Sequence, residues 1–149
     1  LLSAIFITHQ HKDHVWALDE FTKAYPEADI YASKASNDSR YSFNIIKENN
    51  LYKFGSFEIE AYKTSGHTED GMSFKVTGNS NNIMFVGDAI FAHSQGGTNS
   101  RKAYLQAITM NCLSILSQPD DTILAPGHGP LTTVRHEKKN NPFYAGKTS

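Results

Sequence analysis

The chain has 149 residues, of which 39% are hydrophobic, so it can build one domain with a core, and wholesale disorder is excluded. Its formal net charge of −1 offers neither a basic surplus for nucleic acid nor an acidic tail. A single cysteine excludes an intramolecular disulfide, and no apolar run reaches membrane-spanning length. We therefore expect a cytoplasmic protein with neither a nucleic-acid nor a membrane partner.

The first half of the chain alternates apolar runs with polar connections. Residues 1–8 are short and apolar and predict a buried strand, while residues 14–25 have helical spacing and predict a helix. Trp16, within that helix, is interpreted as a packing residue. Further strands are predicted over residues 29–32, 51–54 and 57–63, with mostly loop over residues 33–50.

The second half predicts a hairpin, a long helix and a last strand. Strands over residues 72–77 and 83–86 flank a turn at residues 78–81. Residues 101–117 are the clearest helix, with one apolar stripe. The stripe consists of Leu105, Ile108, Cys112, Ile115 and Leu116. A strand over 122–125 and a short helix after Thr132 complete an α/β (α+β) mixture, in which short connections favour antiparallel strands.

Four residues after the first strand form the pattern H-x-H-x-D-H. His9 and His11 are two positions apart in an extended segment, so their side chains point to the same side and can bind one ion together. Asp13 and His14 follow where the chain turns into the helix, within reach of a second ion. Imidazole and carboxylate groups suit zinc, with iron or manganese as alternatives.

Three further metal-type side chains share one context, because each follows an apolar strand and a glycine. They are His67, Asp88 and His128. Glycine lets the backbone turn sharply, so four strand ends would present seven ligands at one edge of a sheet. The count is complete for two divalent ions: one is held by His9, His11 and His67, the other by Asp13, His14 and His128, and Asp88 bridges both.

At this point the sequence resembles a known family. The segments THQHKDH, SGHT, FVGDAIF and APGHGPLTT resemble the metallo-β-lactamase superfamily, in particular its glyoxalase-II-like hydrolases. The ending HEKKNNPF is similar to the E-x-x-x-N-P-F end of small hydroxyacylglutathione-hydrolase-like members. The resemblance implies an αββα sandwich, with residues 1–149 as a partial metallo-β-lactamase domain, because the family strands that precede the H-x-H-x-D-H motif are not in this sequence. We expect either a longer natural protein or a homo-oligomer to cover the exposed edge of the first sheet.

The resemblance and the ligand set together predict a metal-dependent hydrolase. A hydroxide bridging two divalent ions would attack a carbonyl, with Asp13 and Asp88 as catalytic residues and Asp13 also orienting the hydroxide. No general acid is evident, which favours a small-molecule thioester, activated ester or lactone over an unactivated amide. The loop residues His93, Asn99 and Arg101 are candidate substrate contacts, and His136 is expected on the surface.

Two other interpretations stay open. A persulfide-dioxygenase-like oxidoreductase of the same fold would hold a single iron with ligands matching His9 or His11, His67 and Asp88. The chain could also be a catalytically inactive metal-binding fragment. Three departures from the glutathione-specific relatives argue against a glutathione thioester in particular. The loop after His67 is acidic, no basic residue closely follows Asp88, and the C-terminal helical domain is not in the sequence.

Overall fold

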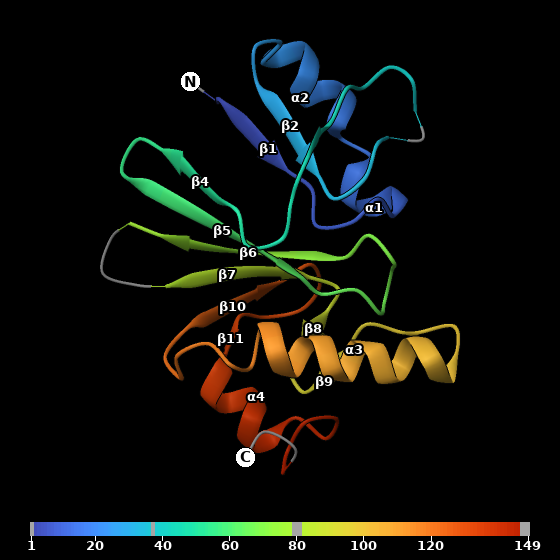
Figure 1. Ribbon diagram of the computed structural model, residues 1–149, viewed down its shortest axis with the longest axis vertical. Helices are drawn as coiled ribbons and strands as arrows, with labels where there is room; N and C mark the ends of the chain where they lie inside the picture. The colour runs from blue at the N-terminus through green and yellow to red at the C-terminus, as the bar shows by residue number, and fades with distance from the viewer. Residues whose placement is uncertain (1, 37, 79–81, 147–149) are drawn as a thin grey trace.

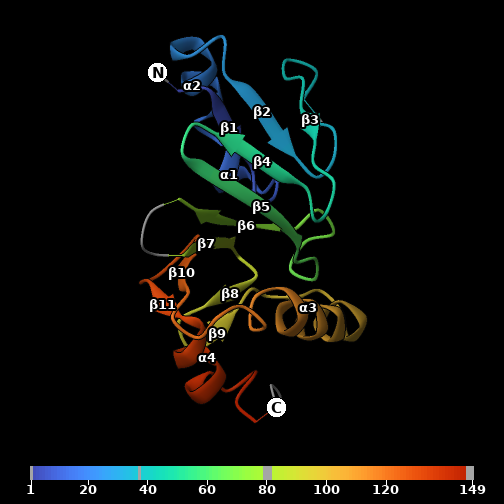
Figure 2. The ribbon, with the colours of Figure 1, turned by 60° about the vertical axis from the view of Figure 1, so that its left-hand side comes forward.

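The computed structural model describes residues 2–36, 38–78 and 82–146 and arranges them in four layers (Figure 1). Two helices cover one face of a three-stranded sheet, and the other face of that sheet packs on a six-stranded sheet. Two more helices cover the far face of the six-stranded sheet, as the turned view also shows (Figure 2). This order of layers confirms the predicted αββα sandwich.

The three-stranded sheet is parallel throughout. It contains β1 (Ala4–Phe6), β2 (Asp29–Ala32) and β3 (Asn44–Ile45), in that order. β3 lies in the stretch predicted as loop and adds only a two-residue edge strand. β1 forms the opposite edge, and β2 is its only partner among the described strands. Cover for this edge, by further chain or by a second copy, stays a prediction.

The single helix predicted over residues 14–25 is in fact two helices, α1 (Lys12–Val15) and α2 (Leu18–Ala24). Val15 and Leu18 both pack in the apolar cluster under the three-stranded sheet, so the apolar spacing continues across a break in the helix. Trp16 lies at that break and is 71% exposed. The packing role predicted for Trp16 is therefore wrong.

The six-stranded sheet has the order β11-β10-β7-β6-β5-β4. Its strands are β4 (Leu51–Phe54), β5 (Phe57–Lys63), β6 (Met72–Thr77), β7 (Ile83–Gly87), β10 (Ile123–Pro126) and β11 (Thr132–Thr133). All neighbouring pairs are antiparallel except β7 and β10, whose connection contains the long helix α3 (Arg101–Ser114). The strands predicted for this sheet are confirmed within one residue, except that β11 was not predicted. In the three-stranded sheet, the buried strand predicted over residues 1–8 is shorter, Ala4–Phe6, and only half-buried. The predicted turn at 78–81 falls mostly outside the described residues.

Apolar clusters hold the large sheet on both faces. Between the two sheets, Phe6 stacks on Tyr31 with ring centroids 4.7 Å apart and meets Phe74 edge-on at 5.2 Å. On the outer face, Met84 and Leu124 are fully buried under the helices. Burying an aliphatic side chain of this size stabilises the fold by about 1.5–3 kcal/mol.

α3 ends three residues earlier than predicted, and one position of its predicted apolar stripe is exposed. The N–H of Leu116 donates to Asn111 O at 2.9 Å, a wider span than the helical bond, so the last turn opens. Leu105 is 53% exposed because the helix buries Ala107 and Asn111 instead, and the predicted stripe was wrong at that position. Its other four positions lie in or against the outer cluster. None of the described helices is long and apolar enough to cross a bilayer.

The C-terminal part is fastened by one buried carboxylate. Glu137 is 0% exposed and accepts hydrogen bonds from Thr132 Oγ1 (2.6 Å), Asn141 Nδ2 (2.7 Å) and the N–H of His93 (3.0 Å). These bonds join the C-terminal helix to a small two-stranded sheet that the sequence did not predict. The elements concerned are α4 (Val134–Asn140), which confirms the predicted short helix, and the strands β8 (Ile90–Phe91) and β9 (Ser94–Gln95).

Candidate metal centre

Four strand ends meet at one edge of the sandwich. Backbone hydrogen bonds fix them in place, since Gly127 N–H donates to Gly87 O (2.9 Å) between the ends of β10 and β7, and Met72 N–H at the start of β6 donates to Thr8 O (2.8 Å) after β1. The turns that leave these strands bring seven side chains together, as predicted from their spacing. Those that follow β1 are His9, His11, Asp13 and His14, and those that follow β5, β7 and β10 are His67, Asp88 and His128.

His9, His11 and His67 form the first candidate ligand group. The Nδ1 atom of His11 lies 3.1 Å from Nε2 of His9 and 3.1 Å from Nε2 of His67. Ligand atoms at about 2.0–2.1 Å from a tetrahedral ion lie about 3.3 Å apart, close to this spacing. His67 Nδ1 lies 2.7 Å from Gly97 O. Donation to that carbonyl places the ring proton on Nδ1 and leaves Nε2 as the ligand atom.

Asp13, His14 and His128 form the second candidate ligand group. Asp13 Oδ2 lies 3.2 Å from Nε2 of His128 and 3.6 Å from Nε2 of His14. The hydrogen bond to its own backbone N–H, together with the two neighbouring imidazoles, holds the pKa of Asp13 below its ordinary value. Asp13 and His128 are both exposed, so this group forms the open side of the centre.

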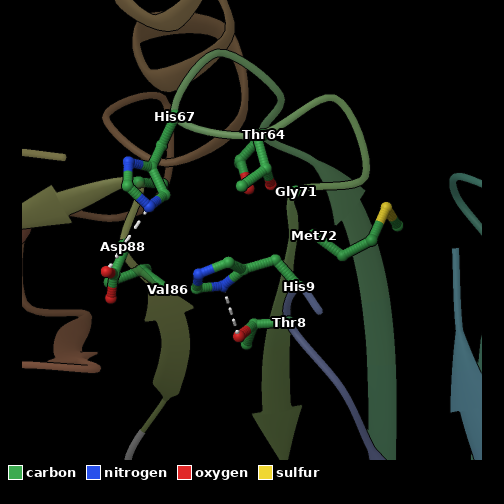
Figure 3. Close-up of a pocket in the computed structure, with 10 residues that line it drawn as sticks. Thr8, His9, Thr64, His67, Gly71, Met72, Val86 and Asp88 are labelled. Atoms are coloured by element: carbon green, nitrogen blue, oxygen red, sulfur yellow. Dashed lines mark hydrogen bonds and ion pairs between the residues drawn. The ribbon is translucent and has the colours of Figure 1, made fainter. Parts of the chain in front are cut away.

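Asp88 lies between the two groups and is buried. Its Oδ1 atom is 3.2 Å from His14 Nε2, and its Oδ2 atom is 3.6 Å from both His67 Nε2 and His128 Nε2. Figure 3 shows His9, His67 and Asp88 converging on a small cavity, whose volume is about 10 Å³. The carboxylate therefore faces ligand atoms of both groups, as expected for a bridging residue.

The buried polar atoms of the centre fit a cation. Asp88 Oδ1 and His14 Nε2 are both buried without a hydrogen-bond partner, although they lie 3.2 Å apart. Such orphaned atoms are costly in a protein interior unless an ion or water satisfies them. Burial, and then the nearby His14, lowers the pKa of His9 to about 4, so His9 is neutral at pH 7, as a metal ligand must be. The donor set of imidazoles and carboxylates suits zinc or iron.

Two glycines lie where a side chain would collide with the centre or with the helix packed against it. A Cβ at position 127 would lie 2.5 Å from His14 Cε1 and 2.6 Å from Asp88 Oδ1. A Cβ on Gly66 would meet the Cβ of Ala107 at 2.4 Å, so α3 packs directly against the turn that carries His67. The glycines before His67 and His128 are thus required by close packing, and Gly66, with a φ of 149°, by its backbone conformation as well.

One buried residue of the centre was missed from the sequence. Asp70 is 8% exposed, and its Oδ2 atom accepts a hydrogen bond from the N–H of Gln10, between the first two ligands. Ser33 Oγ donates to the main-chain oxygen of Asp70 at 2.7 Å. The acidic loop after His67 was visible in the sequence as a departure from the family pattern, but its burial against the first motif was not.

The three candidate substrate contacts are not among the seven candidate ligands, and all three lie on the surface. Asn99 and Arg101 are exposed around the N-terminus of α3, where Ser100 is the cap residue. His93 is exposed and borders a surface hollow together with His136, whose surface position is confirmed. Their contact with a substrate stays a prediction.

Comparison with known proteins adds the following relationships. A family model described as the metallo-beta-lactamase superfamily matches residues 2–128. A probable metallo-hydrolase of Streptococcus pyogenes serotype M6 is 30% identical over 96% of this chain and 71% of its own length. The probable hydroxyacylglutathione hydrolase glo2 of Schizosaccharomyces pombe is 28% identical over 85% of this chain, which spans only 48% of that protein.

Two solved structures share the fold closely. ETHE1 from Myxococcus xanthus superposes with a TM-score of 0.81 and 26% identity, over 98% of this chain and 64% of its own. The B3 metallo-beta-lactamase BLEG-1 superposes with a TM-score of 0.83 and 26% identity, over 97% of this chain and 78% of its own. The chain thus spans between about half and about four fifths of the proteins it matches.

Proposed function

The chain belongs to the metallo-beta-lactamase superfamily, and from that premise we propose that it is a metal-dependent hydrolase that cleaves thioesters and related activated esters or lactones. The superfamily binds divalent metals, typically zinc or iron. The observation that carries the proposal is the position of Asp88, whose carboxylate lies 3.6 Å from a nitrogen of the first ligand group and 3.2 Å and 3.6 Å from two nitrogens of the second. That arrangement supports two ions held side by side.

In this mechanism the chain's residues would hold the metal ions, orient the attacking water and leave one side of the centre open to the substrate. His9, His11 and His67 would hold one ion and Asp13, His14 and His128 the other, with Asp88 shared. Divalent ions bound there lower the pKa of water toward neutrality and polarise a carbonyl oxygen. The Asp13 carboxylate is exposed and has a lowered pKa, so at neutral pH it is ionised and can accept a hydrogen bond from the attacking water.

The substrate class follows from the leaving group. A thiolate, with a thiol pKa of about 8.5, departs without a strong general acid. The similarity to the fission yeast hydroxyacylglutathione hydrolase supports a thioester, whereas the exposed Glu69 in the loop after His67 does not favour an anionic glutathione moiety. We therefore propose small thioesters, with lactones and activated esters next.

A second candidate is a persulfide-dioxygenase-like oxidoreductase with one iron. The similarity to ETHE1 supports it, and so does the 3.6 Å distance between His67 Nε2 and Asp88 Oδ2, which would allow a single ion held by His9 or His11 with these two residues. The two candidates differ in metal stoichiometry and in oxygen uptake. A third outcome, retained metal without any turnover, would indicate an inactive metal-binding fragment.

Elemental analysis coupled to a substrate screen tests the proposal. We expect two divalent ions per chain and hydrolysis of S-lactoylglutathione or simpler thioesters, with a lactone and a β-lactam run alongside. Asp88→Asn should lose at least one ion and most turnover, whereas Glu69→Gln, at an exposed position of the loop after His67, should keep both ions. Full turnover by metal-free His67→Ala protein would refute a metal-dependent hydrolase. One iron per chain with persulfide-dependent oxygen uptake would establish the second candidate instead.

A further inference from the structure

Two histidines outside the centre meet at the surface. His93 follows β8 and His136 lies on α4, 43 residues further along the chain, yet their Nε2 atoms are 2.9 Å apart. The two rings are perpendicular, with centroids 4.6 Å apart. Both side chains line a surface hollow of about 330 Å³, so the pair is accessible to solvent.

The backbone holds the two rings in this position. His93 has a φ of 61°, a left-handed conformation that is uncommon for a residue other than glycine. Its N–H donates to the buried carboxylate of Glu137, which anchors the strained position. On the other side, the N–H of His136 donates to the side chain of Thr133, the cap residue of α4. Strain that the surrounding structure stabilises in this way is found preferentially at functional sites.

The distance between the two nitrogens is compatible with adjacent ligand positions on one ion. Nitrogens bound at about 2.0–2.1 Å lie about 2.9 Å apart when they occupy adjacent positions at right angles, and about 3.3 Å apart in a tetrahedral site. The His93–His136 pair has the first spacing. Square-planar and tetragonal sites with nitrogen and oxygen ligands are those of Cu²⁺ and Ni²⁺.

We propose that His93 and His136 form a second, peripheral metal site, which binds one Cu²⁺ or Ni²⁺ ion through their two Nε2 atoms with water in the remaining positions. Neither histidine is among the seven candidate ligands of the centre, so this inference does not depend on the proposed function. On binding, the proton between the two nitrogens moves through solvent to Nδ1 of the same ring, so that two neutral imidazoles present their Nε2 atoms to the ion.

Asn140 offers a way to tune the site without touching its ligands. Its Nδ2 atom lies 3.3 Å from His136 Nδ1, and donation there keeps the ring proton of neutral His136 on Nε2, the atom that must bind the ion. In Asn140→Asp, the carboxylate would accept a proton on Nδ1 and free Nε2. This change should tighten Cu²⁺ binding by about tenfold, as carboxylate partners of ligating histidines do.

Electron paramagnetic resonance with Cu²⁺ tests the proposal on the whole chain, first loaded with zinc. We expect one tetragonal Cu²⁺ per chain with hyperfine structure from two nitrogens. His93→Ala and His136→Ala should each remove that signal, whereas Arg135→Ala, an exposed neighbour on α4, should retain it. Copper that exchanges into the zinc centre appears in every variant alike, and the spectrum of the double variant His93→Ala/His136→Ala subtracts it.

The proposal fails if the wild-type and double-variant spectra are the same, which would leave the pair as a hydrogen bond between two imidazoles. It also fails if Asn140→Asp leaves the affinity for Cu²⁺ unchanged. Because both histidines are exposed, their replacement should not prevent folding, and circular dichroism of each variant checks this. If the wild-type protein hydrolyses no thioester, lactone or activated ester, the proposed function is refuted, whereas the result with Cu²⁺ still stands.

Discussion

The carboxylate of Asp70 accepts a hydrogen bond of 3.1 Å from the backbone N–H of Gln10, across 60 residues of sequence. Gln10 is the residue between His9 and His11, and Asp70 lies in the turn that carries His67. One buried carboxylate thus fixes the relative position of the three nitrogens of the first ligand group. Lys34 Nζ, 3.8 Å from the same oxygen, is its nearest cation among the described ion pairs.

We predict that Asp70→Ala selectively lowers the affinity of the first ligand group for its metal ion. Loss of the acceptor leaves the partly buried N–H of Gln10 without its partner, which costs about 1 kcal/mol of stability. Loss of a residue that orients ligands lowers metal affinity by about 10- to 100-fold. Competition with a chelator should therefore show that one ion per chain binds more weakly than in the wild type and that the other binds with unchanged affinity. Asp70→Asn, which keeps an acceptor oxygen, should recover part of the affinity, and Glu69→Gln should match wild type. Equal weakening of both ions would contradict a role specific to the first group.

Gly127→Ala should disable the centre without unfolding the protein. The new Cβ would lie within 2.6 Å of atoms of His14 and Asp88, so one of these side chains must move. We expect a loss of metal from the second group and a fall in turnover of about 100-fold or more, since small displacements at a reacting centre have effects of that size. Gly97→Ala, where a Cβ meets nothing within 4 Å, is the matched control. Unchanged metal content in Gly127→Ala would show that the ligands tolerate the displacement.

The metal-free protein should lose stability as the pH falls from about 6.5 to about 4. Burial lowers the pKa of His9 from its ordinary 6.5 to about 4, so over this range the unfolded chain binds a proton that the folded chain does not. Proton uptake then favours unfolding, by at most about 3 kcal/mol from this residue. Urea unfolding in the presence of a chelator, at several pH values, measures the effect. His9→Gln should show a correspondingly shallower pH dependence, and an identical slope in both proteins would contradict the shift.

Removal of the Glu137 carboxylate should destabilise the C-terminal part strongly. Glu137→Ala leaves three donors without their acceptor, among them the N–H of His93. At about 1–3 kcal/mol for a buried unpaired group, and with partial relaxation, we expect a loss of about 3–5 kcal/mol. Glu137→Gln keeps one acceptor oxygen and should cost less. Chemical unfolding compares the two, and similar losses in both would show that shape matters more than hydrogen bonding here.

Most of the centre could be predicted from the sequence because each ligand lies close to the end of an apolar strand. A strand end has a defined position at the edge of a sheet, so the spacing of His67 and Asp88 from their strands placed both at the same edge. The two-residue spacing of His9 and His11 likewise gave them one side of an extended segment. These are local relationships, and local relationships are visible in a sequence.

Elements whose structure depends on distant packing were predicted less well. The apolar spacing of Val15 and Leu18 was recognised, but not the break between them at Trp16. Leu105 fits a helical stripe equally well, and only the position of the sheet decides that Ala107 faces inward in its place. The β8–β9 pair is too short to show any periodicity.

The amino-acid sequence was sufficient to predict the candidate ligands of the centre and the strands that deliver them, because both follow from the periodicity and chemistry of neighbouring residues, and the resemblance of its motifs to a known family predicted the fold. The tertiary structure alone decided that Asp70 is buried against Gln10 and that His93 lies against His136. Contacts of this kind join residues 60 and 43 positions apart, and no local pattern records them. They arise only when the packed layers bring separate loops to the same edge of the molecule.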